Sequence, residues 1–491
     1  MNHRKNFALA IVSSGLIALL SPPAHATDYE VGPGGGMLSS IGEVPWESLG
    51  TGDRVLIHWR ATPYAEKWVL CRRGTAAAPI VISGVPGPAG QLPVIDGRDA
   101  VTRTQLDYWN QSRGVLKIGG ANTPPDTLPG HIVIENLEIR SGRPPYSFTN
   151  SDDDTEPYVN NAAAIYVEKA EHLVIRNCVL HDSGNGLFIG AYDGATQDIL
   201  IDGNRIYDNG IEGRYYEHNT YTAAIHITYQ YNRFGRLREN CGGNNLKDRS
   251  AGLVVRYNWI EGGNRQLDLV DAEDSAVLVD HPDYRTTHVY GNVLIEPDDE
   301  GNSQIVHYGG DSGTIEDYRK GTLHFFHNTV ISTRLGNTTL MRLSTNDEHA
   351  DVRNNVVYTT ASGSYLAMLA SSGVMDLRTN WLRSGWVVSH STFDGTLNDH
   401  GTNITGTDPG FYDFASQDFS PVPGSACEDA GGPLNPNVLP DHEPVRQYVR
   451  HQRSSVRPGI GARDLGAFES GVLFANGFED GDTYEWSASQ P

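Results

Sequence analysis

The sequence has few cysteines, and they form no motif that could bind a metal. The four cysteines among 491 residues are scattered, with no Cys-x-x-Cys pair and no histidine at zinc-site spacing. They allow three disulfide pairings, and the sequence favours none of them. Basic residues are also scarce, because 37 Lys and Arg stand against 60 Asp and Glu. This balance argues against general nucleic-acid binding, which requires a basic face.

Long apolar runs are absent after the first twenty residues. Arg4 and Lys5 precede an apolar stretch over residues 7–20, and Ala24-His25-Ala26 follows with small residues at its two ends. We expect a secretory signal peptide rather than a membrane anchor, because the run is shorter than the ~20 residues of a spanning helix. The exported protein, extracellular or periplasmic, would be a monomer with 35 basic and 60 acidic residues. An anionic ligand would then require positive charge gathered locally.

A short pattern recurs along the chain, in which apolar or β-branched residues lead into an asparagine. The asparagines that carry it are Asn136, Asn177, Asn204, Asn258, Asn292, Asn328, Asn355 and Asn380. Two of the intervals are 27 residues, and the interval from Asn204 to Asn258 is 54, or two periods. A fixed period of this length predicts a solenoid, and the short β-branched segments predict strands. We expect each asparagine to occupy a left-handed corner and to bond the asparagine of the next coil.

These asparagine-punctuated coils resemble the right-handed parallel β-helix superfamily of pectate, alginate and chondroitin lyases. Residues 29–34, 52–57, 78–82 and 94–97 resemble the capping entry of such proteins, and residues 408–411, 423–426 and 464–469 resemble their exit. The resemblance spans about residues 28–469 and implies an all-β, single-stranded right-handed parallel β-helix with an N-terminal cap and inserted loops. We expect a signal peptide (1–26), a cap with the first coils (27–110), the β-helix (111–430), a closing segment (431–470) and an acidic-aromatic tail (471–491). Because this fold carries many functions, the resemblance is weak evidence for the reaction.

Side chains on a strand alternate between the interior and the surface. If the aliphatic residues point inward, the outward residues are Tyr166, Phe188, His226, Lys247, Arg249, Gln266 and Asp268. Successive coils stack about 4.8 Å apart. We therefore expect one surface stripe that runs from aromatic residues through histidine to basic residues and a carboxylate.

The segment 215–271 combines tyrosines with local positive charge. Residues 233–265 contain seven basic side chains and three acidic ones. Exposed aromatic rings suit sugar faces, and arginine suits carboxylates. We expect these residues to form one trough that binds an acidic polysaccharide. The expected substrate-binding residues are Arg265, Asp268, Tyr166, Phe188, Tyr229, Tyr231 and Asn219.

This set of side chains suits a lyase that acts on uronic acids. Such an enzyme needs a base for the C5 proton, a cation for the C6 carboxylate and an acid for the leaving oxygen. Lys247 is the expected base, with its pKa lowered by Arg249, and Arg249 and Arg265 would hold the carboxylate. His226, His218 and Tyr221 are the alternative base or acid.

Residues 243–250 also resemble the segment of alginate and chondroitin-B lyases that carries a catalytic lysine, which maps here to Lys247. Those enzymes place an arginine on the next strand, whereas residues 266–271 contain none. Their calcium-binding Asn and Glu set is not clearly matched either. The sequence therefore does not decide whether calcium is a cofactor, and it assigns no metal ligands.

Two other functions fit the same sequence. An inverting glycoside hydrolase of this fold would need carboxylates clustered on adjacent coils, and Asp268 and Asp271 supply one partial pair. A non-catalytic polysaccharide-binding surface protein would keep the aromatic residues and need no tuned lysine or histidine. Unsaturated products would indicate the lyase, new reducing ends without them the hydrolase, and binding alone the non-catalytic protein.

Overall fold

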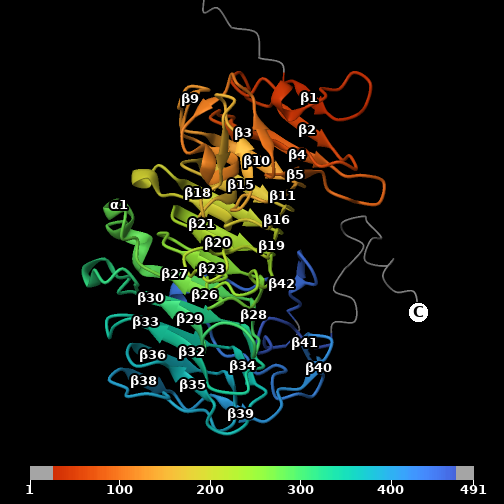
Figure 1. Cartoon of the computed structure of the whole chain (residues 1–491). Coiled ribbons are helices and arrows are strands. Elements are labelled where there is room, and N and C mark those ends of the chain that lie inside the picture. Colours follow the sequence, from red (N-terminus) through yellow and green to blue (C-terminus); the bar gives the residue numbers. More distant parts are fainter. Residues whose placement is uncertain (1–25, 460, 472–491) are drawn as a thin grey trace, which may run out of the picture.

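The computed structural model describes residues 26–459 and 461–471. The chain winds into the expected right-handed parallel β-helix, whose coils each add a strand to three long sheets (Figure 1). The first sheet contains β1 (Asp28–Val31), β2 (Arg54–His58), β4 (Ile80–Val85), β10 (Gly130–Glu135), β15 (Glu171–Arg176), β18 (Gln197–Asp202), β21 (Ile225–Gln230), β24 (Val254–Arg256), β27 (Thr286–Tyr290), β30 (Thr322–Phe326), β33 (His349–Arg353), β36 (Val374–Arg378) and β38 (Thr396–Asp399).

The second sheet has the shortest strands. It contains β5 (Val94–Asp96), β11 (Glu138–Arg140), β16 (Val179–His181), β19 (Arg205–Ile206), β22 (Arg233–Phe234), β25 (Trp259–Glu261), β28 (Val293–Glu296), β31 (Thr329–Ser332), β34 (Val356–Thr359), β37 (Trp381–Arg383) and β39 (Ile404–Gly406). The third sheet carries the candidate site. It contains β13 (Thr155–Pro157), β12 (Ser147–Thr149), β6 (Ala100–Thr102), β3 (Glu66–Leu70), β8 (Gly114–Ile118), β14 (Ala163–Val167), β17 (Asn185–Ile189), β20 (Thr220–Thr222), β23 (Leu246–Asp248), β26 (Leu267–Leu269), β29 (Gln304–Tyr308), β32 (Thr338–Leu343) and β35 (Leu366–Leu369).

The remaining elements are short and lie in loops or at the ends. Three antiparallel pairs are β7 (Asp107–Tyr108) with β9 (Ala121–Thr123), β40 (Phe411–Asp413) with β41 (Asp418–Pro421), and β42 (Arg446–Val449) with β43 (Arg453–Val456). The α-helix of the described chain, α1 (Ala276–Val279), lies in an insertion after β26. None of the described helices is long and apolar enough to span a membrane. All but the last residue of the expected signal peptide and all but the first residue of the tail lie outside the described residues.

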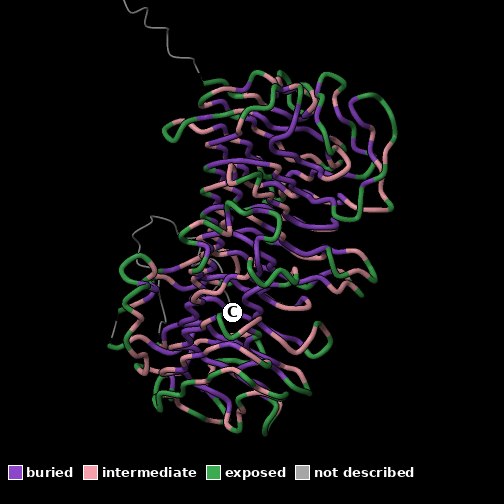
Figure 2. The backbone as a smooth tube through the Cα atoms, turned by 90° about the vertical axis from the view of Figure 1, so that its left-hand side faces the viewer, coloured by how far each residue is buried: buried purple, intermediate pink, exposed green. Residues whose placement is uncertain are grey.

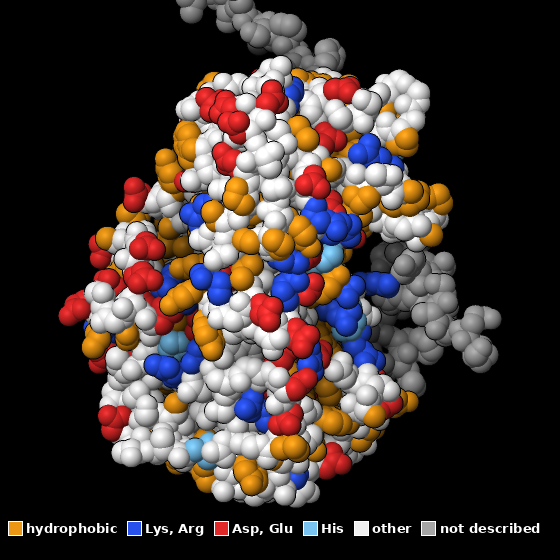
Figure 3. Space-filling model, viewed as in Figure 1, with side chains coloured by type: hydrophobic (Ala, Val, Ile, Leu, Met, Phe, Trp, Pro, Cys, Tyr) orange, Lys and Arg blue, Asp and Glu red, His pale blue; other side chains and the backbone are white. Residues whose placement is uncertain are grey.

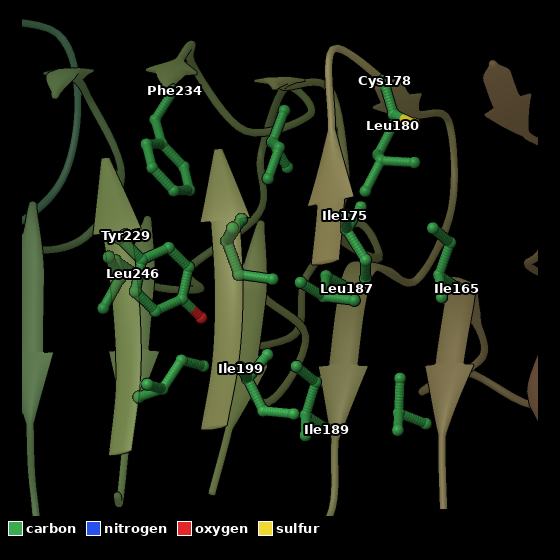
Figure 4. Packing of buried hydrophobic residues seen from close by; sticks show 14 of the residues in the cluster. Ile165, Ile175, Cys178, Leu180, Leu187, Ile189, Ile199, Tyr229, Phe234 and Leu246 are labelled. Atoms are coloured by element: carbon green, nitrogen blue, oxygen red, sulfur yellow. The ribbon is translucent and has the colours of Figure 1, made fainter. Parts of the chain in front are cut away.

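The interior is a column of aliphatic side chains from all three sheets. Ile165 of β14, Leu187 of β17 and Leu246 of β23 point inward from the third sheet, and Ile199 and Tyr229 face them from the first (Figure 4). Buried positions follow the strands along the axis, and exposed positions lie mostly on the connecting loops (Figure 2). The alternation of inward and outward residues that the sequence predicts on the third sheet is therefore confirmed.

The asparagine ladder is confirmed, but its residues do not occupy the left-handed corners. The ladder contains Asn204, Asn232, Asn258, Asn292, Asn328, Asn355, Asn380 and Asn403, each bonded through its side chain to the next. The left-handed residue is the one before, such as Tyr257 or Gly291, with φ of 54° and 67°. Asn136 and Asn177 are themselves at such corners, with φ of 58° and 52°. A ladder asparagine points inward and bonds buried carbonyls, which leaves the turn to its neighbour.

The segment after β41 returns along the outside of the coils (Figure 1). Phe468 and Tyr448 pack with Trp259 and Val293 of the second sheet. Gln452 Nε2 donates a hydrogen bond of 2.8 Å to the Gly203 carbonyl, 249 residues earlier in the chain. The segment thus covers an apolar outer face in the middle of the solenoid.

Candidate active site

One column of outward side chains crosses the third sheet. The strand register aligns Lys117, Tyr166, Phe188, Tyr221, Lys247, Asp268, His307 and Arg342, one from each successive coil. The expected stripe is thus present, with two errors. Gln266, expected to face outward, is fully buried and donates to Glu296. Tyr221 of β20 occupies the place expected for His226, because β21 belongs to the first sheet and not to the third.

A cleft of about 1120 Å³ lies over this column. Basic and acidic side chains are interspersed across the middle of the face that carries β20, β23 and β26 (Figure 3). The cations that line the cleft are Arg113, Arg214, Lys247, Arg249, Arg265 and Arg342. Its carboxylates are Glu217, Asp268, Glu273, Asp274 and Asp311. Positive charge is therefore concentrated here relative to a chain with a net charge of −23.

Lys247 lies at the centre of the cleft between two carboxylates. Its Nζ donates a hydrogen bond of 3.1 Å to Asp268 and also contacts Asp311. Burial lowers the pKa of Lys247, but Asp268 and Asp311 more than offset this, so that its pKa lies above the ordinary value. The predicted lowering of this pKa is wrong in net direction: Arg249 does lower it, but the two carboxylates outweigh that effect.

Arg249 joins the column to two inserted loops. Its Nε donates to the Tyr221 hydroxyl at 2.9 Å, and its Nη2 lies 2.9 Å from Glu273 and 3.0 Å from Asp311. Burial raises the pKa of Glu273. For Asp311, burial is outweighed by Lys247 and Arg249, which lower its pKa. The pKa values of the two carboxylates that contact this guanidinium group are thus shifted in opposite directions, upward for Glu273 and downward for Asp311.

Asp268 is a buried anion that holds several neighbours in place. It accepts hydrogen bonds from Lys247 and Asn244 and pairs with His307 Nδ1 at 2.8 Å. Its pKa lies well below the ordinary range, because Lys247 and His307 outweigh its burial. Arg265 Nη1 lies 3.8 Å from it. Asp268 therefore acts as a permanent charge that orients the lysine.

His218 lines the cleft as a neutral imidazole. Burial, together with the charge of Lys247, lowers its pKa to about 3. The backbone N–H of Asn244 donates to His218 Nδ1 at 2.8 Å. The proton of the neutral ring is therefore on Nε2, and the side chain can donate a hydrogen bond there but not accept a proton.

Several residues expected in the trough lie elsewhere. His226 is on the outer face of the first sheet and pairs with Asp283. Tyr229 points into the interior, where its hydroxyl bonds Thr222, and Tyr231 stacks on Tyr257 at a corner of the first sheet. Asn219 is buried and bonds Asn245. Tyr166 belongs to the column but is only 4% exposed, beneath the guanidinium group of Arg113.

The expected convergence of the seven basic residues of 233–265 is also wrong for four of them. Lys247, Arg249 and Arg265 reach the cleft. The other four, on the first and second sheets or in the loop after β22, are Arg233, Arg236, Arg238 and Arg256. A coil turns through three faces, so a basic run along the chain is divided among them.

Five further residues line the cleft and are not among the predicted site residues: His307, Arg342, Asp311, Glu273 and Arg113. Extending the register of Lys247 and Asp268 to later coils would have found His307 and Arg342. Asp311 and Glu273 come from loops of irregular length, and no periodic signal marks them. The position of loop residues depends on packing that the repeat does not encode.

The cleft does not fit calcium. Ca²⁺ takes six to eight oxygen ligands, whereas Asp268, Asp311 and Glu273 are each held by a lysine or arginine. Among the described residues, the groups of three that could hold a metal ion both contain histidines and lie outside the cleft. No catalytic step is therefore derived through calcium.

No protein-family model and no curated protein matches this chain. Among solved structures, it is similar to pectate lyase Pel9A, with a TM-score of 0.47, 11% identity, and coverage of 91% of this chain and 97% of that one. An alginate lyase from Paenibacillus sp. str. FPU-7 has a TM-score of 0.39 and 13% identity, with coverage of 71% of this chain and 93% of that one. A GH136 lacto-N-biosidase from Eubacterium ramulus has a TM-score of 0.41 and 11% identity, with coverage of 78% of this chain and 68% of that one. Likeness at this level concerns the fold alone.

Proposed function

We propose that the protein cleaves a polysaccharide containing uronic acids by β-elimination in this cleft, outside the cytoplasm. The observation that supports this proposal most directly is the set of cations near Asp268. Within the described part of the chain, Arg342 is exposed and makes no hydrogen bond or ion pair, and Arg265 is hydrogen-bonded to neutral Gln304. Among the described residues, Arg342 has no counter-ion and Arg265 has one, Asp268 at 3.8 Å, so both suit the carboxylate of a bound sugar.

The side chains supply the three groups that the reaction requires. Arg265 and Arg342 would neutralise the C6 carboxylate, so that charge can build there as the C5 proton leaves. Lys247 in its amine form would remove that proton. The Tyr221 hydroxyl accepts a hydrogen bond from Arg249, so its own proton is available for the leaving glycosidic oxygen. Phe188 and Tyr221 offer aromatic surface to the sugar rings.

An assay on a panel of uronic-acid polymers tests the proposal. The purified protein should produce ultraviolet absorbance from unsaturated uronate ends on at least one polymer, and none on neutral glucans. New reducing ends without that absorbance would show that the protein is a hydrolase and not a lyase. Binding without either product would show that the protein binds a polysaccharide without cleaving it.

A second candidate, a glycoside hydrolase, is favoured by one specific observation. Glu273 and Asp311 contact the same nitrogen of Arg249, and their pKa values are moved apart, upward for Glu273 and downward for Asp311. Glycoside hydrolysis uses two carboxyl groups that flank the scissile bond, an acid whose pKa is raised and a second group that is ionised, and these two shifts have the required directions. Glu273→Gln would then abolish the release of reducing ends, whereas a lyase would retain its activity.

A further inference from the structure

His226, displaced from the cleft, belongs to a separate cluster on the first sheet. Its Nε2 lies 2.8 Å from Asp283 Oδ2, and His281 Nδ1 lies 3.9 Å from the same oxygen. The ligand atoms of these three residues lie within 4.8 Å of one another. His226 and Asp283 are about half exposed, so an ion from solvent can reach them.

The strand register accounts for the position of His226. His131, His172, Asp198, His226 and Gly252 form one corner column, all with positive φ. A Cβ atom at Gly252 would lie 2.5 Å from the His226 ring and 3.6 Å from Asp283 Cβ. The absence of a side chain at Gly252 therefore leaves the space in which His226 reaches Asp283.

Asp198 supports the imidazole from behind. Its Oδ1 lies 3.6 Å from His226 Nδ1, while His226 Nε2 faces Asp283. A carboxylate behind one ring nitrogen, with the other nitrogen directed to a ligand position, is the usual arrangement around a metal-bound histidine.

We propose that His226, His281 and Asp283 bind a divalent transition-metal ion of the Zn²⁺ class, with Asp198 orienting His226. Two imidazoles and one carboxylate favour Zn²⁺ over Ca²⁺ or Mg²⁺, which prefer oxygen ligands. The backbone N–H of Asp283 donates to His281 Nδ1 at 3.2 Å, and the metal would replace this hydrogen bond. Water would complete the coordination.

The second histidine cluster is a poorer site. His131 and His172 stack face to face with centroids 4.5 Å apart, and the carboxylate of their neighbour Glu171 is already paired with Arg73. This cluster therefore supplies a matched control on the same corner column.

The metal would fasten an insertion that also forms a wall of the cleft. Glu273 and Asp274 of this insertion line the cleft, and His281 and Asp283 follow α1 further along it. Tyr284 anchors this segment, since the Ala272 N–H donates to its hydroxyl at 2.8 Å. A metal ion would add a link from this insertion to β21.

Titration of the full-length protein with Co²⁺, followed by visible absorption and by Zn²⁺ competition, tests the site. We expect one ion per chain, displaced by Zn²⁺, and a higher melting temperature with Zn²⁺. His281→Ala and His226→Ala should abolish the Co²⁺ spectrum, and Asp198→Asn should weaken binding by roughly 10–100-fold. His131→Ala, in the second cluster and without a contact to Asp198 among the described residues, should change neither. The metal-free melting temperature of each variant checks its fold.

Absence of one-to-one binding by the wild-type protein would overturn the proposal. So would an unchanged spectrum in His281→Ala, or its loss in His131→Ala. The readout is metal binding, so the result is independent of whether the cleft cleaves a polysaccharide.

Discussion

At the scale of single residues, the surroundings of each side chain decide its chemistry more than its type does. Lys247 and His218 both line the cleft. Lys247 is held as a cation by two carboxylates, and His218 is kept neutral by burial and by the charge of Lys247. Lys247 can therefore gain a base function only by losing a proton that Asp268 and Asp311 stabilise, and His218 is limited to donating a hydrogen bond.

Replacing Lys247 tests its place in the reaction. Lys247→Ala should lower turnover by at least about 100-fold, because it removes the proposed base. The measurement is the rate of unsaturated-uronate formation, with circular dichroism to check the fold. Lys169→Ala is the control, because Lys169 also pairs with an aspartate, Asp126, but does not line the cleft. Equal activity of the two variants would remove Lys247 from the mechanism.

The pH dependence distinguishes the two candidate reactions. The pKa of Lys247 lies above its ordinary value of 10.5, so the amine form is a small fraction at neutral pH. For the lyase, kcat/KM should rise about tenfold per pH unit between pH 7 and 9. For a hydrolase with Glu273 as the acid, the rate should instead fall as pH rises through the raised pKa of Glu273. A flat profile would contradict both assignments.

Arg342 should contribute to binding rather than to protonation. Arg342→Ala should lower kcat/KM on a uronic-acid polymer by ~10–100-fold, the value of a hydrogen bond to a charged group. Arg378→Ala, on the first sheet, is the control. An equal loss on a polymer whose carboxylates are esterified would show that Arg342 does not bind the carboxylate.

At the scale of elements, coil-to-coil hydrogen bonds fix the register that builds the column. Asn292 accepts from the backbone and side chain of Asn258 and donates to Asn328. It is fully buried, so no water replaces a lost partner. Each ladder asparagine thereby links two neighbouring coils and aligns their strands.

Truncating one ladder residue should therefore be costly. Asn292→Ala should lower the free energy of unfolding by about 2–4 kcal/mol, because it removes the acceptor of the buried Asn258 backbone N–H and the donor to Asn328. Urea denaturation followed by fluorescence measures this. Asn264→Ala, in a half-buried loop position, is the control and should change stability by less than about 1 kcal/mol. Similar losses in both variants would mean that the ladder adds no particular stability.

At the scale of the whole molecule, the C-terminal segment covers the outer face of the second sheet. Trp259 of β25 stacks on Phe419 with centroids 5.6 Å apart, and Phe468 packs in the same cluster. Residues far apart in the chain thus share one apolar surface. The returning segment buries side chains that a solenoid alone would expose to water.

Loss of that contact should weaken the whole fold. Phe468→Ala should lower the free energy of unfolding by about 3 kcal/mol, as for other buried aromatic residues. Tyr412→Ala is the control, since Tyr412 is 70% exposed. A chemical denaturation curve measures both, and an unchanged midpoint in Phe468→Ala would show that the segment does not stabilise the coils.

The sequence by itself determined the solenoid, its period and half of the outward column, because alternation and the asparagine repeat are local properties of each strand. It also predicted that Lys247 and Asp268 share a face, from the alternation on each strand, and the register in which the two strands pair confirms this. Only the tertiary structure placed His226 on the first sheet and brought Asp311 and Glu273 to Arg249. These positions depend on which of three faces a residue occupies and on how loops of irregular length pack, and no local pattern records either.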